Sequence, residues 1–385
     1  MTEQSLTRKT AEQPLVDAVI AVHSPTRPIE RAVGSILDHT RADVRVTVVI
    51  HNTDPEPILA RLRPYADDPR LRTDVFADGI PSPAGPMNRG FDLATAAYTT
   101  LLGSDDAFEP GAIDAWLAAA RLPGGRRADA VIAPVRDEAG RLHPSPPVRS
   151  TRIGARRNGR SSRRSAELDG ARDRLAYRAA ALGLIGRDRF GGLRFAEGVE
   201  TGEDQPFSAE LWFAPGSRIV FPVRAPGYRV HADQHDRVTH GARSVDTEFR
   251  VLEALLDPGA SWSRDPAARL SLAVKLIRMQ LFDAVRNRLE DWDSQTAEQL
   301  ARVARRVLEW EPRAPRLLAR VDERLLRAIL AADTDTARLG GLLEARARLR
   351  SPAALLPRRP GYALHPQAPL RFHLAGALLL RLGSR

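Results

Sequence analysis

Two adjacent carboxylates follow a short apolar run in the segment LLGSDDAFEP, residues 101–110. Asp105 and Asp106 repel each other at a few ångströms unless a cation, a hydrogen-bond donor or water separates them. A second acidic pair, Glu203 and Asp204, lies about 100 residues further on, directly before an amphipathic stretch. Carboxylates suit two kinds of chemistry, which are holding a hard divalent cation and removing a proton.

Each acidic pair also has a purely structural explanation. An aspartate-rich turn can cap a helix that begins near Pro110. The pair Glu203–Asp204 can be stabilised by the dipole of the helix that follows it. Spacing alone therefore leaves both explanations open, and the surrounding elements have to be considered.

Short β-branched runs alternate with amphipathic stretches from residue 16 onwards. They predict strands in the segments 16–23, 44–52, 71–78, 98–106 and 128–137. They predict helices in 28–40, 55–66 and 110–121, and a loop followed by a helix in 82–97. Repeated strand–helix–strand units of this length predict a mostly parallel sheet with helices on both faces. Ligands of such sheets bind at the carboxyl ends of the strands, which is where Asp105 and Asp106 are expected.

The sequence changes character after about residue 245, where helical periodicity replaces the strand runs. We therefore expect a flexible N-terminus (1–14), an α/β domain (15–240), a helical domain (241–344) and a basic, apolar tail (345–385). No run of about 18 uncharged apolar residues is present, and the polar start lacks the apolar core of a secretory signal, so a cytoplasmic location is expected. Because the chain has no cysteine, any metal must bind oxygen or imidazole.

The net charge of +10 is concentrated in two places. Residues 149–164 contain seven arginines and residues 345–385 contain eight, in both cases without an acidic residue, so the rest of the chain is slightly acidic. Only Lys9 and Lys275 are lysines among the 58 basic residues. Nucleic-acid binding is not favoured, because no aromatic residues are interleaved with the arginines.

Three separated segments form one recognisable pattern. They are VIAVHSPTRPIERAVGSIL (19–37), GPMNRGFDLATAAYTTLLGSDDAFEPGAIDAWL (85–117) and GGLRFAEGVETGEDQPFSAELW (191–212). Their order and spacing resemble the inverting, nucleotide-sugar-dependent glycosyltransferases of the GT-A fold in the large family 2, over about residues 15–235. The resemblance implies a GT-A α/β fold with a helical extension, a UDP-sugar donor by default, and a divalent cation, Mn²⁺ or Mg²⁺. It implies hexosyl transfer to a hydroxyl of a cell-surface glycan, an anionic polymer or a lipid-linked acceptor.

The same resemblance implies roles for individual residues. Asp105 matches the metal ligand of the family's Asp-x-Asp motif, whose first aspartate is replaced here by Gly103; Asp106 and His231 are further candidate ligands. Asp204 matches the general base, with Glu203 as a contact to the acceptor. The candidate nucleotide contacts are Ser24, Thr26, Arg27, Asn52, Asn88, Arg89 and Ser104. For His231 and Arg89, simple exposure to solvent is an equally open interpretation.

The two basic segments each allow more than one interpretation. Arg156, Arg157 and Arg160 are candidates for gripping the donor diphosphate or an anionic acceptor, and a solvated surface loop is the alternative. The tail suits peripheral docking to the anionic inner face of a membrane, or packing against the helical domain or a second subunit in a homo-oligomer. A rival function is a catalytically inactive protein of this fold that binds an anionic polymer or nucleic acid, because Gly103 departs from the motif.

Overall fold

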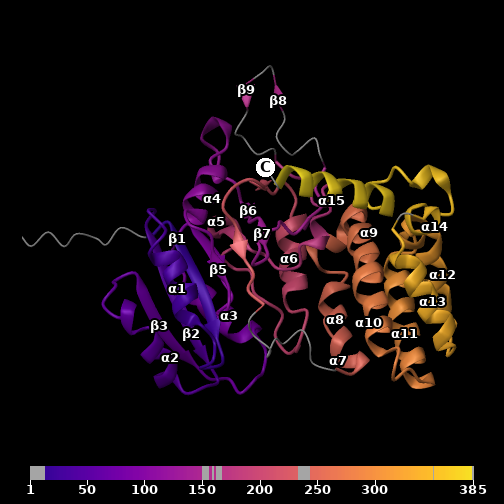
Figure 1. Cartoon of the computed structure of the whole chain (residues 1–385), viewed down its shortest axis with the longest axis horizontal. Helices are drawn as coiled ribbons and strands as arrows, with labels where there is room; N and C mark the ends of the chain where they lie inside the picture. Colours follow the sequence, from indigo (N-terminus) through magenta and orange to yellow (C-terminus); the bar gives the residue numbers. More distant parts are fainter. Residues whose placement is uncertain are drawn as a thin grey trace, which may run out of the picture.

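The computed structural model describes residues 14–149, 156–157, 160–161, 167–232, 243–349 and 351–383. An α/β part and a helical part lie side by side, with β1 to β3 at one end of the molecule and α11 to α14 at the other (Figure 1). Within the described residues, no helix combines the length and the apolar character needed to cross a bilayer.

The central sheet has the strand order β11-β6-β10-β4-β1-β2-β3. Its strands are β1 (Val16–Val22), β2 (Val44–His51), β3 (Leu71–Phe76), β4 (Tyr98–Leu101), β6 (Ala130–Ile132), β10 (Gly183–Gly186) and β11 (Ile219–Val220). Strand β1 pairs in parallel with β2 and β4, and β10 is antiparallel to both of its neighbours. The chain order reverses between β1 and β4, which is the position where sheets of this kind bind ligands.

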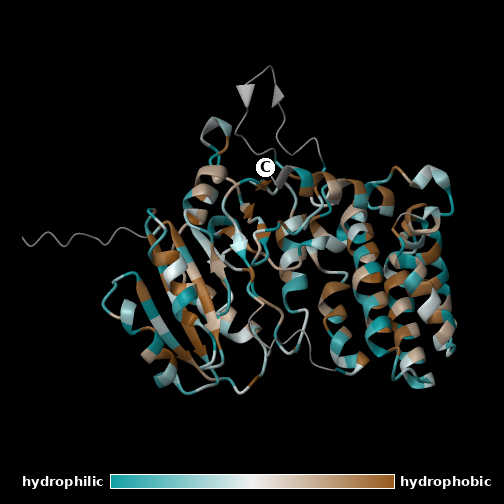
Figure 2. Ribbon diagram, viewed as in Figure 1, coloured by the Kyte–Doolittle hydropathy of each residue, from teal (hydrophilic) through white to brown (hydrophobic). Residues whose placement is uncertain are grey.

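Both faces of this sheet are covered, as the β-branched runs predicted. Side chains of β1 alternate between two cores: Val16, Ala18 and Ile20 join the cluster with α1 (Ile29–Leu37) and α4 (Ala112–Ala120), and Val19 joins the other. The second cluster includes α3 (Ala84–Leu93) and α6 (Asp204–Phe213) and continues into the helical part. Figure 2 shows apolar residues dominating the central strands and alternating with polar ones around the helices.

A small second sheet brings distant segments to the end of β4. It consists of β5 (Ala107–Phe108), β12 (Tyr228–Arg229) and β7 (Val135–Arg136) in the order β5-β12-β7. The single strand predicted over 128–137 is therefore two strands, β6 and β7, in different sheets. Pro134 lies between them, and because proline has no N–H it cannot continue the ladder.

The helical part consists of short and longer helices that follow the α/β part. Its helices are α7 (Val245–Phe249), α8 (Leu252–Leu255), α9 (Pro266–Lys275), the π-helical η7 (Leu276–Leu281), α10 (Phe282–Arg288), α11 (Ser294–Trp310), α12 (Arg320–Leu330), α13 (Thr336–Ala347), α14 (Pro352–Leu355) and α15 (Pro369–Gly383). The remaining elements are α2 (Pro55–Arg61), α5 (Arg187–Phe190), the pair β8 (Arg156–Arg157) and β9 (Arg160–Ser161), and short 3₁₀ helices at 63–65, 123–125, 175–177, 261–264, 314–317 and 360–362.

The basic tail packs against the rest of the chain. Arg174, which is 1% exposed, donates hydrogen bonds to the carbonyls of Pro147 at 2.6 Å and of Pro366 at 2.5 Å. The Nε2 atom of Gln367 donates to Ser271 Oγ at 2.8 Å, on α9. Figure 1 shows α15 lying across one side of the molecule above both parts. The tail is thus held by the α/β part as well as by the helical part.

Candidate active site

A cavity of about 830 Å³ opens at the carboxyl ends of β1, β2 and β4. Its volume is within the range of small-molecule sites. Four of the residues proposed from the sequence lie in its wall, which are Arg27, Asn52, Ser104 and Asp105. The loop 79–83, which follows β3, and the start of α3 complete the wall. The strand order therefore places this cavity where the sheet topology predicts a ligand.

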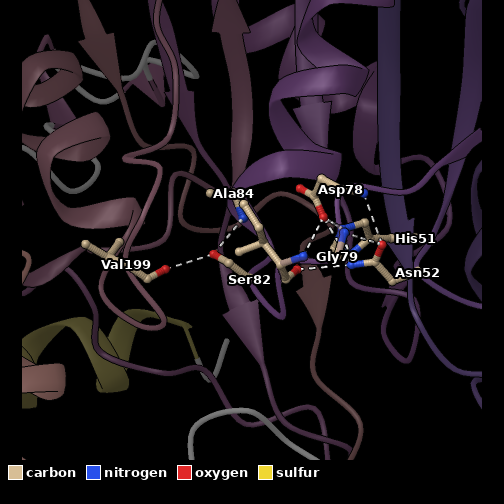
Figure 3. A network of polar contacts seen from close by, with 8 residues as sticks. His51, Asn52, Asp78, Gly79, Ser82, Ala84 and Val199 are labelled. Atoms are coloured by element: carbon tan, nitrogen blue, oxygen red, sulfur yellow. Dashed lines mark hydrogen bonds and ion pairs between the residues drawn. The ribbon is translucent and has the colours of Figure 1, made fainter.

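Asn52 closes one side of the cavity by organising the loop after β3 (Figure 3). Its backbone adopts a left-handed conformation with φ of 52°, and its Oδ1 atom accepts from the N–H groups of Asp78 at 3.1 Å and Gly79 at 3.0 Å. Its Nδ2 atom donates to Asp78 Oδ1 and to the carbonyl of Ile80, both at 3.1 Å. His51 Nε2 lies 2.8 Å from the same Asp78 Oδ1. The amide of Asn52 is thus engaged within the protein.

The cavity wall is tied to the segment that carries the second acidic pair. Ser82 Oγ donates to the carbonyl of Val199 at 2.9 Å (Figure 3). Asn88 on α3 makes a two-way contact with Phe195, donating to its carbonyl at 3.1 Å and accepting from its N–H at 2.8 Å. These contacts join positions more than 100 residues apart. They hold the segment that precedes Glu203 in place relative to the cavity.

The two aspartates of the opening motif have different surroundings. Asp105 lines the cavity, and its Oδ2 atom accepts from Arg27 Nη1 at 2.5 Å, while Arg31 donates to its carbonyl oxygen. Arg27 comes from the turn before α1 and is 5% exposed, so a buried cation lies beside this carboxylate. The repulsion expected between Asp105 and Asp106 is therefore reduced at Asp105 by the positive charge of Arg27.

Asp106 is used inside the protein. Its Oδ2 atom accepts from the Tyr228 hydroxyl at 2.5 Å, and its Oδ1 atom accepts from the N–H of His231 at 2.9 Å. Burial and the charge of Asp106 raise the pKa of Tyr228 well above its usual value, which keeps the hydroxyl protonated as a donor. That hydroxyl also accepts from the N–H of Gly103 at 3.0 Å. Asp106 and His231 therefore clamp β12 to the turn after β4.

The described residues contain no group of three or more histidine or acidic side chains placed to hold a metal. Asp105 is the carboxylate that the described structure places in the wall of the main cavity. A Mg²⁺ ion is commonly held by one or two carboxylates together with substrate phosphates. Asp105 fits this mode of binding, in which the metal arrives with a phosphate-bearing ligand.

Glu203 and Asp204 stand at the start of α6. Burial raises the pKa of Glu203 to about 7, and the neighbouring charge of Asp204 adds to this effect. Burial also raises the pKa of Asp204. A carboxylate whose pKa moves toward neutrality is a better general base at neutral pH than an ordinary aspartate.

Two further hollows adjoin the turn Thr201–Gln205 on the side of the helical part. One has a volume of about 500 Å³ and a wall that is mainly polar, including Thr201, Asn287 and Gln299. The other has about 230 Å³ and is lined by Thr201, Gly202 and Gln205 among others. The acidic pair therefore lies between the segment tied to the cavity wall and a polar surface contributed by the helical part.

The remaining predicted residues lie elsewhere. Ser24 and Thr26 bond to each other at 2.8 Å in the turn after β1 and do not belong to the cavity wall. Arg89 forms a two-pronged ion pair with Asp74 of β3, with both distances 2.9 Å, also outside the wall. For Arg156, Arg157 and Arg160 the structure describes the strands β8 and β9 and not the side chains, so the role expected of these side chains stays a prediction.

Several wall and clamp residues were not predicted. His51 ends β2, so the rule that ligands bind at strand ends could have found it. Ser82 and Tyr228 carry no signal in the sequence, because their roles depend on contacts with Val199 and Asp106 far along the chain.

Neither a protein-family model nor a curated protein matches the sequence. Solved structures match over most of the chain. Residues 1–349 of S. aureus TarS in complex with UDP-GlcNAc align with a TM-score of 0.65 at 15% identity, covering 86% of this chain and 91% of that one. The chain has the GT-A fold. The same TarS fragment in complex with UDP also aligns with a TM-score of 0.65. A longer TarS structure aligns with a TM-score of 0.60 at 14% identity, and the alignment covers 55% of that longer chain. The predicted fold class, a mostly parallel α/β sheet followed by helices, is confirmed.

Proposed function

We propose that the protein is a metal-dependent, inverting glycosyltransferase of the family 2 type, a hexosyltransferase that uses a nucleoside diphosphate sugar. The observation that carries the proposal is the cavity at the strand ends, with Asp105 in its wall and with tethers that lead to Asp204. The structural likeness to TarS bound to UDP-GlcNAc supports a UDP-sugar as the donor.

In the proposed reaction, the acceptor hydroxyl attacks the anomeric carbon of the sugar while the bond from that carbon to the diphosphate oxygen breaks. Asp204 accepts the hydroxyl proton, and positioned proton transfer of this kind contributes about 10² to 10⁴ in rate. Attack opposite the leaving group inverts the anomeric configuration. Arg27 places positive charge beside the part of the cavity that would hold the diphosphate.

Asp105 would hold the divalent cation, Mn²⁺ or Mg²⁺, together with donor phosphate oxygens. Such a cation neutralises the charge that develops on a diphosphate leaving group. Because Asp105 is a single carboxylate, we expect the metal to bind strongly only when the nucleotide is present. This expectation distinguishes the proposed site from a chelating metal site.

The acceptor is proposed to be a hydroxyl of a cell-surface glycan, an anionic polymer or a lipid-linked molecule. The polar hollow beside Thr201 supports a hydroxyl-rich acceptor, because its wall is rich in amide and hydroxyl groups. Peripheral contact with the inner face of a membrane is proposed for α15, where Leu374 and Leu378 are exposed on one helical face. A homo-oligomer through this face is the competing proposal for the same residues.

The first test measures binding and turnover of UDP-sugars by the purified protein with Mn²⁺, Mg²⁺ or a chelator. Calorimetry should show metal-dependent binding of UDP, and release of UDP from the donor should fall by about 10² or more in Asp204→Asn with little change in UDP affinity. Asp188→Asn, which removes an exposed carboxylate on α5, is the matched control.

Retained turnover in Asp204→Asn would contradict the assignment of the base. A wild-type protein that binds no nucleotide and is stabilised instead by an anionic polymer would favour the catalytically inactive alternative.

A further inference from the structure

One buried cation of the helical part is not explained by the reaction as described. Lys275 is the last residue of α9, is 7% exposed, and is one of only two lysines among the 58 basic residues of the chain. Arginine and lysine are not interchangeable in a buried site, because guanidinium is a wide planar fork and ammonium is compact. A chain that otherwise uses arginine has a lysine at this position, which suggests that the site requires the smaller cation.

The surroundings of Lys275 explain this choice. Its Nζ atom donates to Gln205 Oε1 at 2.7 Å, and Gln205 directly follows Asp204 in the first turn of α6. The cavity that Lys275 and Gln205 share with Ser208 has a volume of only about 10 Å³. This is the least that a single water molecule requires, so a guanidinium group has no room there.

Lys275 also interacts electrostatically with Asp204. Burial lowers the pKa of Lys275 to about 8 and the charge of Asp204 opposes this, while burial raises the pKa of Asp204 and the charge of Lys275 opposes that. Further charged groups lie around this turn: Glu203 interacts with Asp204, and Arg243 interacts with Glu203. Glu248 and Asp283 line the adjoining hollow together with Gln205. Burying an ammonium group lowers the stability of the fold unless the group is paired. The position of Lys275 next to an acidic pair therefore needs an explanation.

We infer that Lys275 is a positioning residue for the catalytic base: its ammonium group fixes the first turn of α6 through Gln205 and supplies the positive charge that favours the carboxylate form of Asp204. This inference rests on the proposed function. It gives the helical part a direct role at the site, because α9 lies outside the α/β part that binds the donor. The π-helical η7 begins at the next residue, and such turns are frequent at functional sites.

The test compares the pH dependence of UDP release in the wild type, Lys275→Met and Lys275→Gln. Removal of a nearby positive charge should move the acid limb of the kcat/KM profile upward by about one pH unit in both variants. UDP affinity should change less than twofold. Ser271→Ala, one turn earlier on α9, removes a buried hydroxyl without changing charge and should leave the limb in place.

Several results would overturn the inference. A uniform fall in activity with an unmoved limb would mean that Lys275 only packs the core. A shift in Lys275→Met that Lys275→Gln does not reproduce would assign the effect to the lost hydrogen bond or to packing, because glutamine keeps a donor for Gln205 but carries no charge.

A second measurement needs no activity. Because burial raises the pKa of Asp204, its ionised form destabilises the fold at neutral pH, and Asp204→Asn should raise the melting temperature. That increase should be larger in the Lys275→Met background, where the compensating cation is missing, and equal increases would refute the coupling. If the wild type turns over no nucleotide sugar while the increases still differ, the proposed function fails and the electrostatic coupling remains.

Discussion

Replacing Glu203 by glutamine should stabilise the protein at alkaline pH. Burial, with a smaller contribution from Asp204, raises the pKa of Glu203 from 4.5 to about 7. A carboxyl group with a higher pKa in the folded state binds more protons when folded, so its contribution to stability is lost as the pH rises from about 4.5 to about 7. At about 1.4 kcal/mol for each pH unit, this loss corresponds to about 3 kcal/mol of unfolding free energy. Glutamine cannot ionise, so the variant does not lose this unfolding free energy as the pH rises.

Thermal unfolding between pH 4.5 and 8.5 measures the effect. A chain of 385 residues unfolds with an entropy of about 0.8 kcal/mol/K at about 2.1 cal/mol/K per residue. The variant Glu203→Gln should therefore melt about 4 °C above the wild type at pH 8.5 and within about 1 °C of it at pH 4.5. The difference should grow mainly between about pH 4.5 and 7, where the carboxyl group of the wild type has lost its proton in the unfolded state but keeps it in the folded state.

The matched control is Glu200→Gln, which changes an exposed glutamate three residues earlier in the same segment. It should change the melting temperature by less than about 1 °C at every pH, because exposed charges contribute little. A Glu203→Gln variant that follows the wild type across the whole pH range, or that is stabilised equally at both ends, would refute the reasoning that burial holds this carboxyl group near neutrality.

Two further predictions test the assignments around the cavity. Tyr228→Phe removes the donor to Asp106 and the acceptor for Gly103, and should lower the unfolding free energy by about 1 to 3 kcal/mol in chemical denaturation; an unchanged midpoint would contradict the clamp. Arg89→Gln should leave UDP affinity within twofold in calorimetry, because its partner is Asp74 outside the cavity wall, whereas Arg27→Gln should weaken it at least tenfold; equal effects would place the diphosphate elsewhere.

The sequence is sufficient to predict the sheet and the edge at which the ligand site lies. The β-branched runs and their spacing predict parallel strands, and the order of connections then brings the residues after β1, β2 and β4 together. For this reason the positions of Arg27, Asn52 and Asp105 along the chain are enough to assign them to one site. These predictions depend on local patterns and on topology rules that hold for many sequences.

Side-chain partners could not be predicted in the same way. The hydroxyl of Tyr228 reaches Asp106 across 122 positions, and Ser82 reaches Val199 across 117. No periodicity or spacing encodes such contacts, because they depend on how the loops pack after the sheet has formed. The same limit explains why Arg89 was proposed for the nucleotide, since its position next to Asn88 is local whereas its pairing with Asp74 is tertiary.

The glycine in place of the first motif aspartate has a structural explanation. A Cβ atom at Gly103 would lie 3.0 Å from both Asp106 Oδ2 and the Tyr228 hydroxyl oxygen, and 3.2 Å from Asp105 Oδ1. A larger side chain at this position would therefore displace the hydrogen bond between Tyr228 and Asp106, which holds β12 against the turn. That turn keeps Asp105 in the cavity wall beside Arg27. The turn that carries Gly103 is thus fixed by the contact between Tyr228 and Asp106. The replacement of the first motif aspartate by glycine is therefore not by itself an argument for the catalytically inactive alternative.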